Sequence, residues 1–131
     1  MRMASTLAST KEKGNIREME DRKLLGKIGE DMAESMLFSE GYTILERNFR
    51  SYYGEADIIC KKDGVLFFVE VKTRTSEKFG EPYEAVDEVR QFRMKKTAEY
   101  YLYRKYDGDE PVVAFKVIEI LVRETDDDFI M

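Results

Sequence analysis

Two charged residues interrupt a strongly apolar segment of the chain. The segment Val65–Thr73 is apolar at most positions, yet it contains Glu70 and Lys72. Strand side chains alternate between two faces, so these two residues share a face and lie about 7 Å apart along the strand. In the preceding segment, Glu55 and Asp57 share a face in the same way. A tight turn between the segments can bring three or four carboxylates and one lysine together at one sheet edge.

Clustered carboxylates need a cation or protons, because like charges at short range repel each other. Their oxygens are the donors that Mg²⁺ or Mn²⁺ prefers, and such an ion also binds substrate phosphate. The ion lowers the pKa of a bound water and holds a phosphodiester for in-line attack. Lys72, two residues after Glu70, can orient that water or stabilise transition-state charge. The plainer alternative is a solvated Glu70–Lys72 pair that protects an edge strand from aggregation.

The composition excludes several other mechanisms. The 131-residue chain contains no histidine, which excludes Ser-His-Asp and Cys-His catalysis and histidine-bound zinc. Cys60 is the only cysteine, so no internal disulfide is possible, and its apolar surroundings predict an inert buried thiol. A glycine-rich phosphate loop is absent from the sequence. Catalysis would therefore depend on carboxylates, lysines, hydroxyl groups and a hard metal ion.

The net charge of −5 argues against a protein that simply coats nucleic acid. Much of the acidity lies at one end, since residues 107–131 contain eight acidic and two basic residues. The longest apolar run, Val65 to Val69, is far shorter than the ~20 residues of a membrane span. The N-terminus has no apolar stretch of signal-peptide length. These observations predict a cytoplasmic protein that contacts nucleic acid through local patches and does not contact a membrane.

Hydrophobic periodicity predicts an α/β domain with the element order α-β-β-β-α-β. The predicted helices cover Asp21–Glu40 and Tyr83–Tyr106, and the predicted strands cover Tyr42–Arg47, Ala56–Lys61, Val65–Thr73 and Pro111–Arg123. Asp63-Gly64 predicts a tight hairpin turn, because this pair tolerates positive φ. Residues 21–123 form the predicted domain, residues 1–20 a disordered or loosely helical extension and residues 124–131 an acidic tail.

The first predicted helix has an apolar arc that includes small residues. The arc contains Leu24, Leu25, Ile28, Met32, Met36 and Leu37, with a stripe of Gly26, Gly29 and Ala33. The stripe permits close approach to a sheet. Asp21 is the predicted N-cap and Gly41 the predicted C-terminal stop. The predicted core positions of the second helix are Val86, Val89, Ala98, Tyr101 and Leu102.

Basic residues near the candidate site are suited to nucleic-acid phosphates. Arg74 and Lys78 follow the site in the sequence, and Arg90, Arg93 and Lys96 lie together on the second predicted helix. The alternative for this helix is an ordinary solvated face. Tyr52 and Tyr53, beside Arg50, are suited to stacking on bases near a junction or in a single strand, or else to covering the sheet edge.

Three motifs resemble a YraN-type bacterial family in order and spacing. The motifs are Gly26-Lys27-Ile28-Gly29-Glu30, Gly54-Glu55-Ala56-Asp57-Ile58-Ile59 and Phe68-Val69-Glu70-Val71-Lys72-Thr73-Arg74. The resemblance extends from about Leu24 to Ile120. This family is grouped with Holliday-junction-resolvase-like members of the PD-(D/E)xK nuclease superfamily. The resemblance therefore implies a restriction-endonuclease-like core, with a mixed central β-sheet flanked by α-helices.

The resemblance also implies roles for individual residues. It makes Asp57, Glu70 and Glu30 ligands of Mg²⁺ or Mn²⁺, and Lys72 the catalytic lysine. It implies DNA rather than RNA as the partner, and a homodimer, as in the junction resolvases. The family's last strand carries an acidic residue where this chain has Lys116. That change alters the site if the acid belongs to it, and matters little if the acid only pairs with a basic neighbour.

Two further acidic residues have more than one interpretation. Glu30 lies at the rim of the apolar arc, where a carboxylate can reach over a sheet edge. The alternative is an ordinary surface residue paired with Lys23 or Lys27. Glu55 is an outer ligand, a turn residue or a partner of Arg50, and the supporting role is favoured.

Three functions remain in competition. The first is a metal-dependent endonuclease acting on DNA, including branched or damaged intermediates, in repair or recombination. The second is a non-catalytic nucleic-acid-binding module with the same fold, whose binding would survive EDTA. The third is an interaction protein whose acidic tail, residues 126–128, docks a basic partner.

Overall fold

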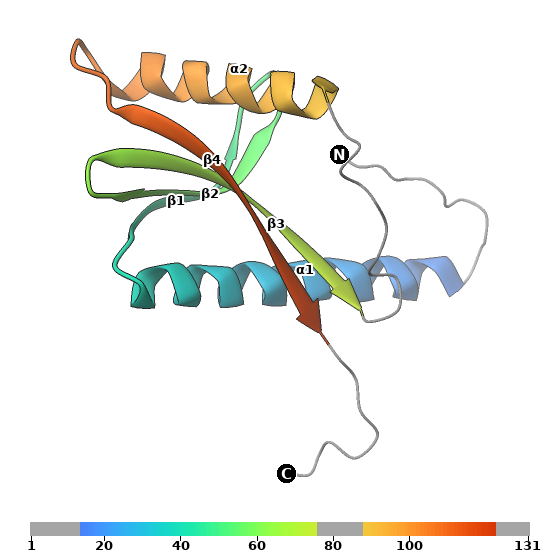
Figure 1. The fold of residues 1–131 in the computed structure, drawn as a ribbon. Helices are drawn as coiled ribbons and strands as arrows, with labels where there is room; N and C mark the ends of the chain where they lie inside the picture. The colour runs from blue at the N-terminus through green and yellow to red at the C-terminus, as the bar shows by residue number, and fades with distance from the viewer. Residues whose placement is uncertain (1–13, 76–87, 123–131) are drawn as a thin grey trace.

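The computed structural model describes residues 14–75 and 88–122, which form two helices and one four-stranded sheet (Figure 1). The elements are α1 (Gly14–Ser39), β1 (Thr43–Arg50), β2 (Glu55–Lys62), β3 (Val65–Thr75), α2 (Glu88–Lys105) and β4 (Val112–Val122). The strand order is β1-β2-β3-β4, with β1, β2 and β3 antiparallel and β4 parallel to β3. The predicted class, mixed sheet and α-β-β-β-α-β order are confirmed.

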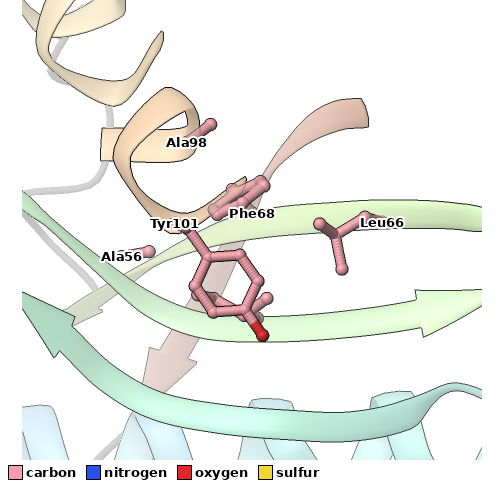
Figure 2. Packing of buried hydrophobic residues seen from close by; sticks show 6 residues of the cluster. Ala56, Leu66, Phe68, Ala98 and Tyr101 are labelled. Carbon is pink, nitrogen blue, oxygen red and sulfur yellow. The ribbon is translucent and has the colours of Figure 1, made fainter. Parts of the chain in front are cut away.

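The sheet separates two apolar clusters, because one helix covers each face (Figure 1). On the α2 side, Phe68 and Tyr101 pack edge to face at 5.6 Å between ring centroids, with Leu66, Ala56 and Ala98 around them (Figure 2). On the α1 side, Ala33 and Leu37 pack on residues of β2 and β3. Strand β3, whose apolar residues contribute to both clusters, is central as its sequence predicts.

Helix α1 begins earlier than predicted and ends where predicted. It starts at Gly14, so Asp21 lies inside the helix and the prediction of an N-cap at Asp21 is wrong. The predicted stop at Gly41 is confirmed: Gly41 has φ 97°, and Tyr42 N–H donates to Leu37 O at 3.0 Å. This pattern is the Schellman motif, in which a glycine adopts the left-handed conformation after the last turn.

The large residues of the predicted apolar arc of α1 are mostly exposed. Leu24, Ile28, Met32 and Met36 all lie outside the core, whereas Ala33 and Leu37 are buried. Small residues let the helix axis approach the sheet closely, so the larger side chains on the flank stay in solvent. The predicted close approach is confirmed, since an added Cβ on Gly29 would lie 1.9 Å from Thr73 Oγ1.

The strand and helix boundaries differ from prediction at a few other places. Strand β1 continues through Arg50, three residues beyond its predicted end, with Asn48 at φ 53° inside it. In α2, Ala98 and Tyr101 are buried as predicted, but Val89 is exposed, and Val86 lies outside the described residues. Cys60 is buried as predicted, and burial raises the pKa of its thiol to about 11.

Some predictions fall on segments that the structure does not describe. These are residues 1–13, residues 76–87, which include Lys78, and residues 123–131, which include the acidic tail. Within the described residues, neither helix is long and apolar enough to cross a membrane.

Candidate active site

Asp57 lies where strands β2 and β3 separate. Their pairing continues to Ile58 opposite Val69 and stops there. One step further, the Asp57 side chain takes the place of the next strand partner, since its Oδ2 accepts a hydrogen bond from Val71 N–H at 2.7 Å. This bond satisfies a backbone donor that the separating strands would otherwise leave without a partner. Asp57 is therefore fixed between the strands by the backbone itself.

The alternation of side chains along β2 breaks at Asp57. In a regular strand, residues two apart share a face. Ala56 nevertheless packs in the cluster on the α2 side and Ile58 in the cluster on the α1 side. The register of β1 and β2 places Asn48, with its positive φ, opposite Asp57. This local distortion lets Asp57 lie between the α1 side and the α2 side of the sheet, where groups from both sides can reach its carboxylate.

Glu70 is held by two basic side chains. Arg90, from the first turn of α2, binds it with two nitrogens, Nε to Oε1 at 3.0 Å and Nη2 to Oε2 at 3.1 Å. Lys72 Nζ lies 3.1 Å from Oε2, as expected for residues two apart on one strand face. A two-nitrogen arginine contact is among the stronger and more directional side-chain pairs. The carboxylate is thus largely neutralised by protein groups.

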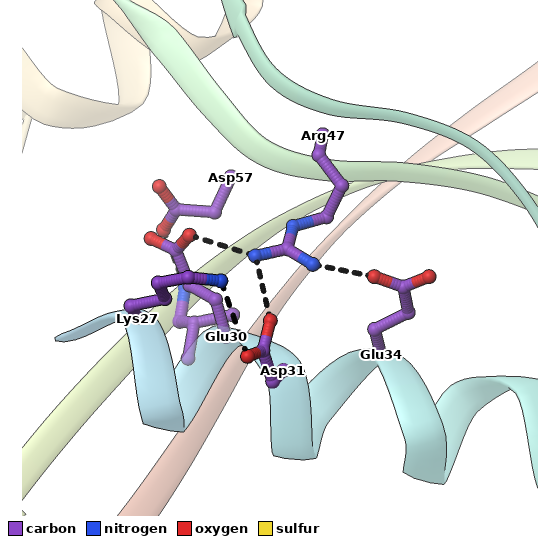
Figure 3. Close-up of polar contacts among 7 residues, drawn as sticks. Lys27, Glu30, Asp31, Glu34, Arg47 and Asp57 are labelled. Carbon is purple, nitrogen blue, oxygen red and sulfur yellow. Dashed lines mark hydrogen bonds and ion pairs between the residues drawn. The ribbon is translucent and has the colours of Figure 1, made fainter. Parts of the chain in front are cut away.

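Glu30 reaches the site from α1. The close contact of Gly29 with Thr73 sets the distance of this helix from β3, and Glu30 follows directly. Its Oε1 lies 3.3 Å from Arg47 Nη2, and Arg47 also binds Asp31 and Glu34 (Figure 3). The same view shows the carboxylates of Glu30 and Asp57 turned toward each other. Arg47 therefore orients Glu30 beside Asp57, and it does so from β1.

The surroundings of Asp57 raise the pKa of its carboxyl group. The pKa of Asp57 is raised from 3.8 to about 6. Burial is the largest cause, the nearby charges of Glu30, Glu70 and Glu55 also raise the pKa, and the hydrogen bond from Val71 N–H lowers it. Such a group is a carboxylate that lacks sufficient positive charge around it. A cation in the groove would supply that charge.

The candidate residues line one groove of about 1340 Å³. Its walls include Glu30, Asp57, Glu70, Lys72 and Glu55. Of the basic residues predicted to bind phosphates, Arg74, Arg90 and Arg93 line it, Lys96 lies beside it over the ring of Phe92, and Lys78 is outside the described residues. Lys116 is not among the groove residues and lies over the rings of Tyr42 and Phe67.

The donors suit a hard divalent cation, although they are not arranged around one. All are oxygens, and Asp57 lies near three further carboxylates. Among the residues that the structure describes, however, no three acidic side chains converge into a ready metal-binding group. Glu70 points to Arg90 and Lys72, and Glu30 points to Arg47. Metal binding would require these carboxylates to exchange partners.

Sequence reasoning missed Arg47 and the contact of Arg90 with Glu70. Arg47 is separated from Glu30 by a helix end and a turn, and its own strand was predicted to stop there. The one available signal was three acidic residues in the second half of α1, Glu30, Asp31 and Glu34, which favour a basic neighbour. Glu55 pairs with Arg50 at 3.6 Å, one of the alternatives open for it.

Comparison with known proteins gives one consistent result. Residues 29–120 match the model of the uncharacterised protein family UPF0102. A UPF0102 protein of Caldicellulosiruptor bescii is 45% identical over 100 residues, which cover 76% of this chain and 84% of the relative. One of Syntrophomonas wolfei is 46% identical over 100 residues (76% and 86%), and one of Clostridium tetani 40% over 107 (82% and 87%). None of these names states an activity.

Proposed function

The chain belongs to the uncharacterised, YraN-type family UPF0102. From the geometry of its candidate site, we propose that the protein is a metal-dependent endonuclease acting on DNA. The observation that carries the proposal is the position of Asp57, a partly buried carboxylate of raised pKa beside Glu30 and Glu70 in an open groove with basic walls. Branched or damaged DNA intermediates of repair or recombination are the candidate substrates.

The residues divide the work of phosphodiester hydrolysis among them. Asp57, Glu70 and Glu30 would hold a Mg²⁺ or Mn²⁺ ion, which when bound supplies a more acidic water and neutralises phosphate charge. Asp57 is fixed by Val71 N–H, so one ligand is already in place. Lys72 Nζ lies 3.1 Å from Glu70, and beside a bound ion it would orient the attacking water or stabilise the developing negative charge.

A second candidate function is a non-catalytic nucleic-acid-binding module of the same fold. The observation in its favour is that Glu70 and Glu30 are neutralised by Arg90, Lys72 and Arg47 without any metal. Such ion pairs neutralise the carboxylates and stabilise the fold without a bound metal ion. The groove and its basic residues would then bind nucleic acid in the presence of EDTA.

A cleavage panel separates the two functions. Labelled single-stranded, duplex, flap and four-way-junction DNA, with matching RNA, would be incubated with Mg²⁺ or Mn²⁺. We expect wild-type protein to cut at least one DNA substrate, and Lys72→Ala to cut it about a hundredfold more slowly, because one transition-state donor is lost. EDTA should abolish cutting. Cutting that persists unchanged in Lys72→Ala would show that the site is wrongly assigned, and metal-independent binding without cutting would favour the module.

Removal of Arg90 is expected to strengthen metal binding. The guanidinium and a metal ion compete for the same Glu70 oxygens, so Arg90→Ala should lower the dissociation constant for Mn²⁺ about fivefold, the size of one charge-assisted contact partly replaced by Lys72. Isothermal titration calorimetry of metal-free protein measures this constant without any substrate.

The matched control for this experiment is Arg93→Ala. Arg93 lies one turn further along α2 and lines the same groove, so its loss changes the charge of the site by the same amount. We expect an effect below about twofold there, because a charge at longer range in an open groove is screened. Equal gains in both variants would mean that only the net charge matters and that the Glu70 contact has no special role.

A further inference from the structure

Exposed aromatic rings stand at the rim of the groove that holds the candidate site. Tyr52 is 95% exposed, Phe92 58% and Tyr53 42%, and all three line the groove with Asp57 and Glu70. Tyr52 and Tyr53 meet edge to face at 5.4 Å between ring centroids. A ring as exposed as Tyr52 contributes almost nothing to the core. An exposed apolar group beside a polar cleft is the usual sign of a binding surface.

The turn that carries Tyr52 is held by hydrogen bonds of the Ser51 side chain and backbone. Ser51 Oγ accepts hydrogen bonds from Tyr53 N–H at 3.0 Å and Gly54 N–H at 3.2 Å, and Ser51 N–H donates to Gly54 O at 2.7 Å. Ser51 Oγ also lies 3.1 Å from Oγ1 of the buried Thr97 on α2. The β1–β2 turn is therefore tied to the second helix, and Tyr52 is presented on a rigid support.

Basic groups surround these rings. Lys96 Nζ lies over two of the rings that line the groove, 5.9 Å from the ring centroid of Tyr53 and 5.7 Å from that of Phe92. Arg50, at the end of β1, and Arg93, on α2, also line the groove. Rings alternating with cations are what a nucleic-acid strand requires, because its bases offer flat π-faces and its phosphates offer charge. The surface thus matches a strand in both respects.

We propose that Tyr52 and Phe92 form a stacking platform for unpaired bases, which makes the substrate of the groove a nucleic acid with single-stranded nucleotides beside the cleavage point. In a continuous duplex the base faces are covered by their neighbours, so only unpaired bases are open to a protein ring. This inference rests on the proposed function for the chemistry of the groove, and it adds the class of substrate: flaps, ends, bubbles or open junction arms rather than uninterrupted duplex.

Binding measurements in EDTA test the platform independently of cleavage. The probes are a fluorescein-labelled single strand of about 12 thymidines, within the usual site size for such grooves, and a blunt duplex of the same length. We expect wild type to prefer the single strand, and Tyr52→Leu and Phe92→Leu each to weaken that binding about tenfold while changing duplex binding less than ~2-fold. Tyr52→Phe keeps the ring and should keep the affinity. A strand with 2-aminopurine should lose fluorescence on binding wild type and less on binding Tyr52→Leu.

The control variant is Tyr103→Leu. Tyr103 is also highly exposed on α2 but does not line this groove, so its loss should change neither affinity. Equal weakening of single strand and duplex by Tyr52→Leu, tighter binding of the duplex, or no binding of the single strand would each overturn the platform. Ring-dependent binding by a protein that cuts nothing would support the platform and contradict the nuclease. Metal-dependent duplex cutting that is unaffected by Tyr52→Leu would support the nuclease and contradict the platform.

Discussion

Gly29→Ala is expected to destabilise the protein by about 3 kcal/mol, the upper part of the range for overpacking a core. An alanine Cβ at this position would lie 1.9 Å from Thr73 Oγ1 and 3.0 Å from Thr73 Cβ and Cγ2. Thr73 belongs to β3 and is paired with Ile120 of β4, which limits its freedom to move away. Helix α1 would have to shift outward along its contact with the sheet. Urea unfolding followed by circular dichroism measures the change.

Gly26→Ala is the control, because it lies on the same helix and an added Cβ there meets no atom within 4 Å. Alanine in an exposed helix interior is favoured over glycine by about 1 kcal/mol, so this variant should be more stable than wild type. The double change Gly29→Ala with Thr73→Ala removes the obstructing Oγ1 and should recover part of the loss, as a coupled pair does. If Gly29→Ala unfolds like wild type, the close approach of α1 to β3 is not real.

The same contact bears on the site, because Glu30 follows Gly29 directly. An outward shift of α1 moves Glu30 away from Asp57 and strains its pair with Arg47. The double variant tests the two roles separately. If it recovers stability but not Mn²⁺ binding, then the contact positions Glu30 in addition to packing α1 against β3. Small residues at this point of the helix are therefore a requirement of the fold and of the position of Glu30 together.

Short-range signals in the sequence predicted the fold well. Asp63 and Gly64 have φ 51° and 81° and form the predicted turn, with Lys62 opposite Val65. Gly41 ends α1 as predicted. Each of these features depends on residues within a few positions of one another, whose backbone preferences act whatever the rest of the chain does.

The apolar arc of α1 shows where periodicity stops being informative. The pattern identified which residues share a face, but not how near that face comes to the sheet. Contact at Gly29 and Ala33 brings the helix close to the sheet. Leu24 and Met32, on the flank of this contact, stay exposed to solvent. Burial in this helix depends on the distance between two elements, which no single-element pattern contains.

The candidate site depends even more on distant residues. The types and order of Asp57, Glu70 and Lys72 came from the sequence, and their catalytic role stays a prediction. The break in strand alternation at Asp57 requires the partner strand with Asn48 at positive φ. Arg90 was predicted to bind phosphate, and in the fold it binds Glu70, twenty residues away on another element. Nothing in a local pattern pairs these two side chains.

Asp57→Asn is expected to make the metal-free protein more stable at neutral pH while removing its response to Mg²⁺. The pKa of Asp57 is 3.8 when unfolded and about 6 when folded, so the folded state holds a proton more tightly. Stability therefore falls as pH rises through this window, by roughly 3 kcal/mol at most once Asp57 is ionised in both states. Asparagine carries no charge, and its side-chain oxygen still accepts from Val71 N–H.

The test compares unfolding free energies of the two proteins in EDTA between pH 4 and pH 8. The advantage of Asp57→Asn should be small at pH 4, grow up to about pH 6 and stay level above it. Asp31→Asn is the control: the hydrogen bond from Lys27 lowers the pKa of Asp31, so its contribution is present above the unfolded pKa and is lost as pH falls. Its replacement should therefore not stabilise the protein at any pH in this range.

Addition of about 10 mM Mg²⁺ at pH 7.5 then tests whether Asp57, which lowers the stability of the metal-free protein, binds the metal ion. A ligand at free concentration c that binds only the folded state raises the unfolding free energy by RT ln(1 + c/Kd), and with it the melting temperature, so wild type should gain stability and Asp57→Asn should not. Parallel responses in the two proteins would rule out Asp57 as a metal ligand, and with it the proposed nuclease. A stabilising Asn that abolishes the metal response would mean that this carboxylate weakens the fold and is kept because the bound cation needs it, which is the behaviour of an active-site group rather than of a structural one.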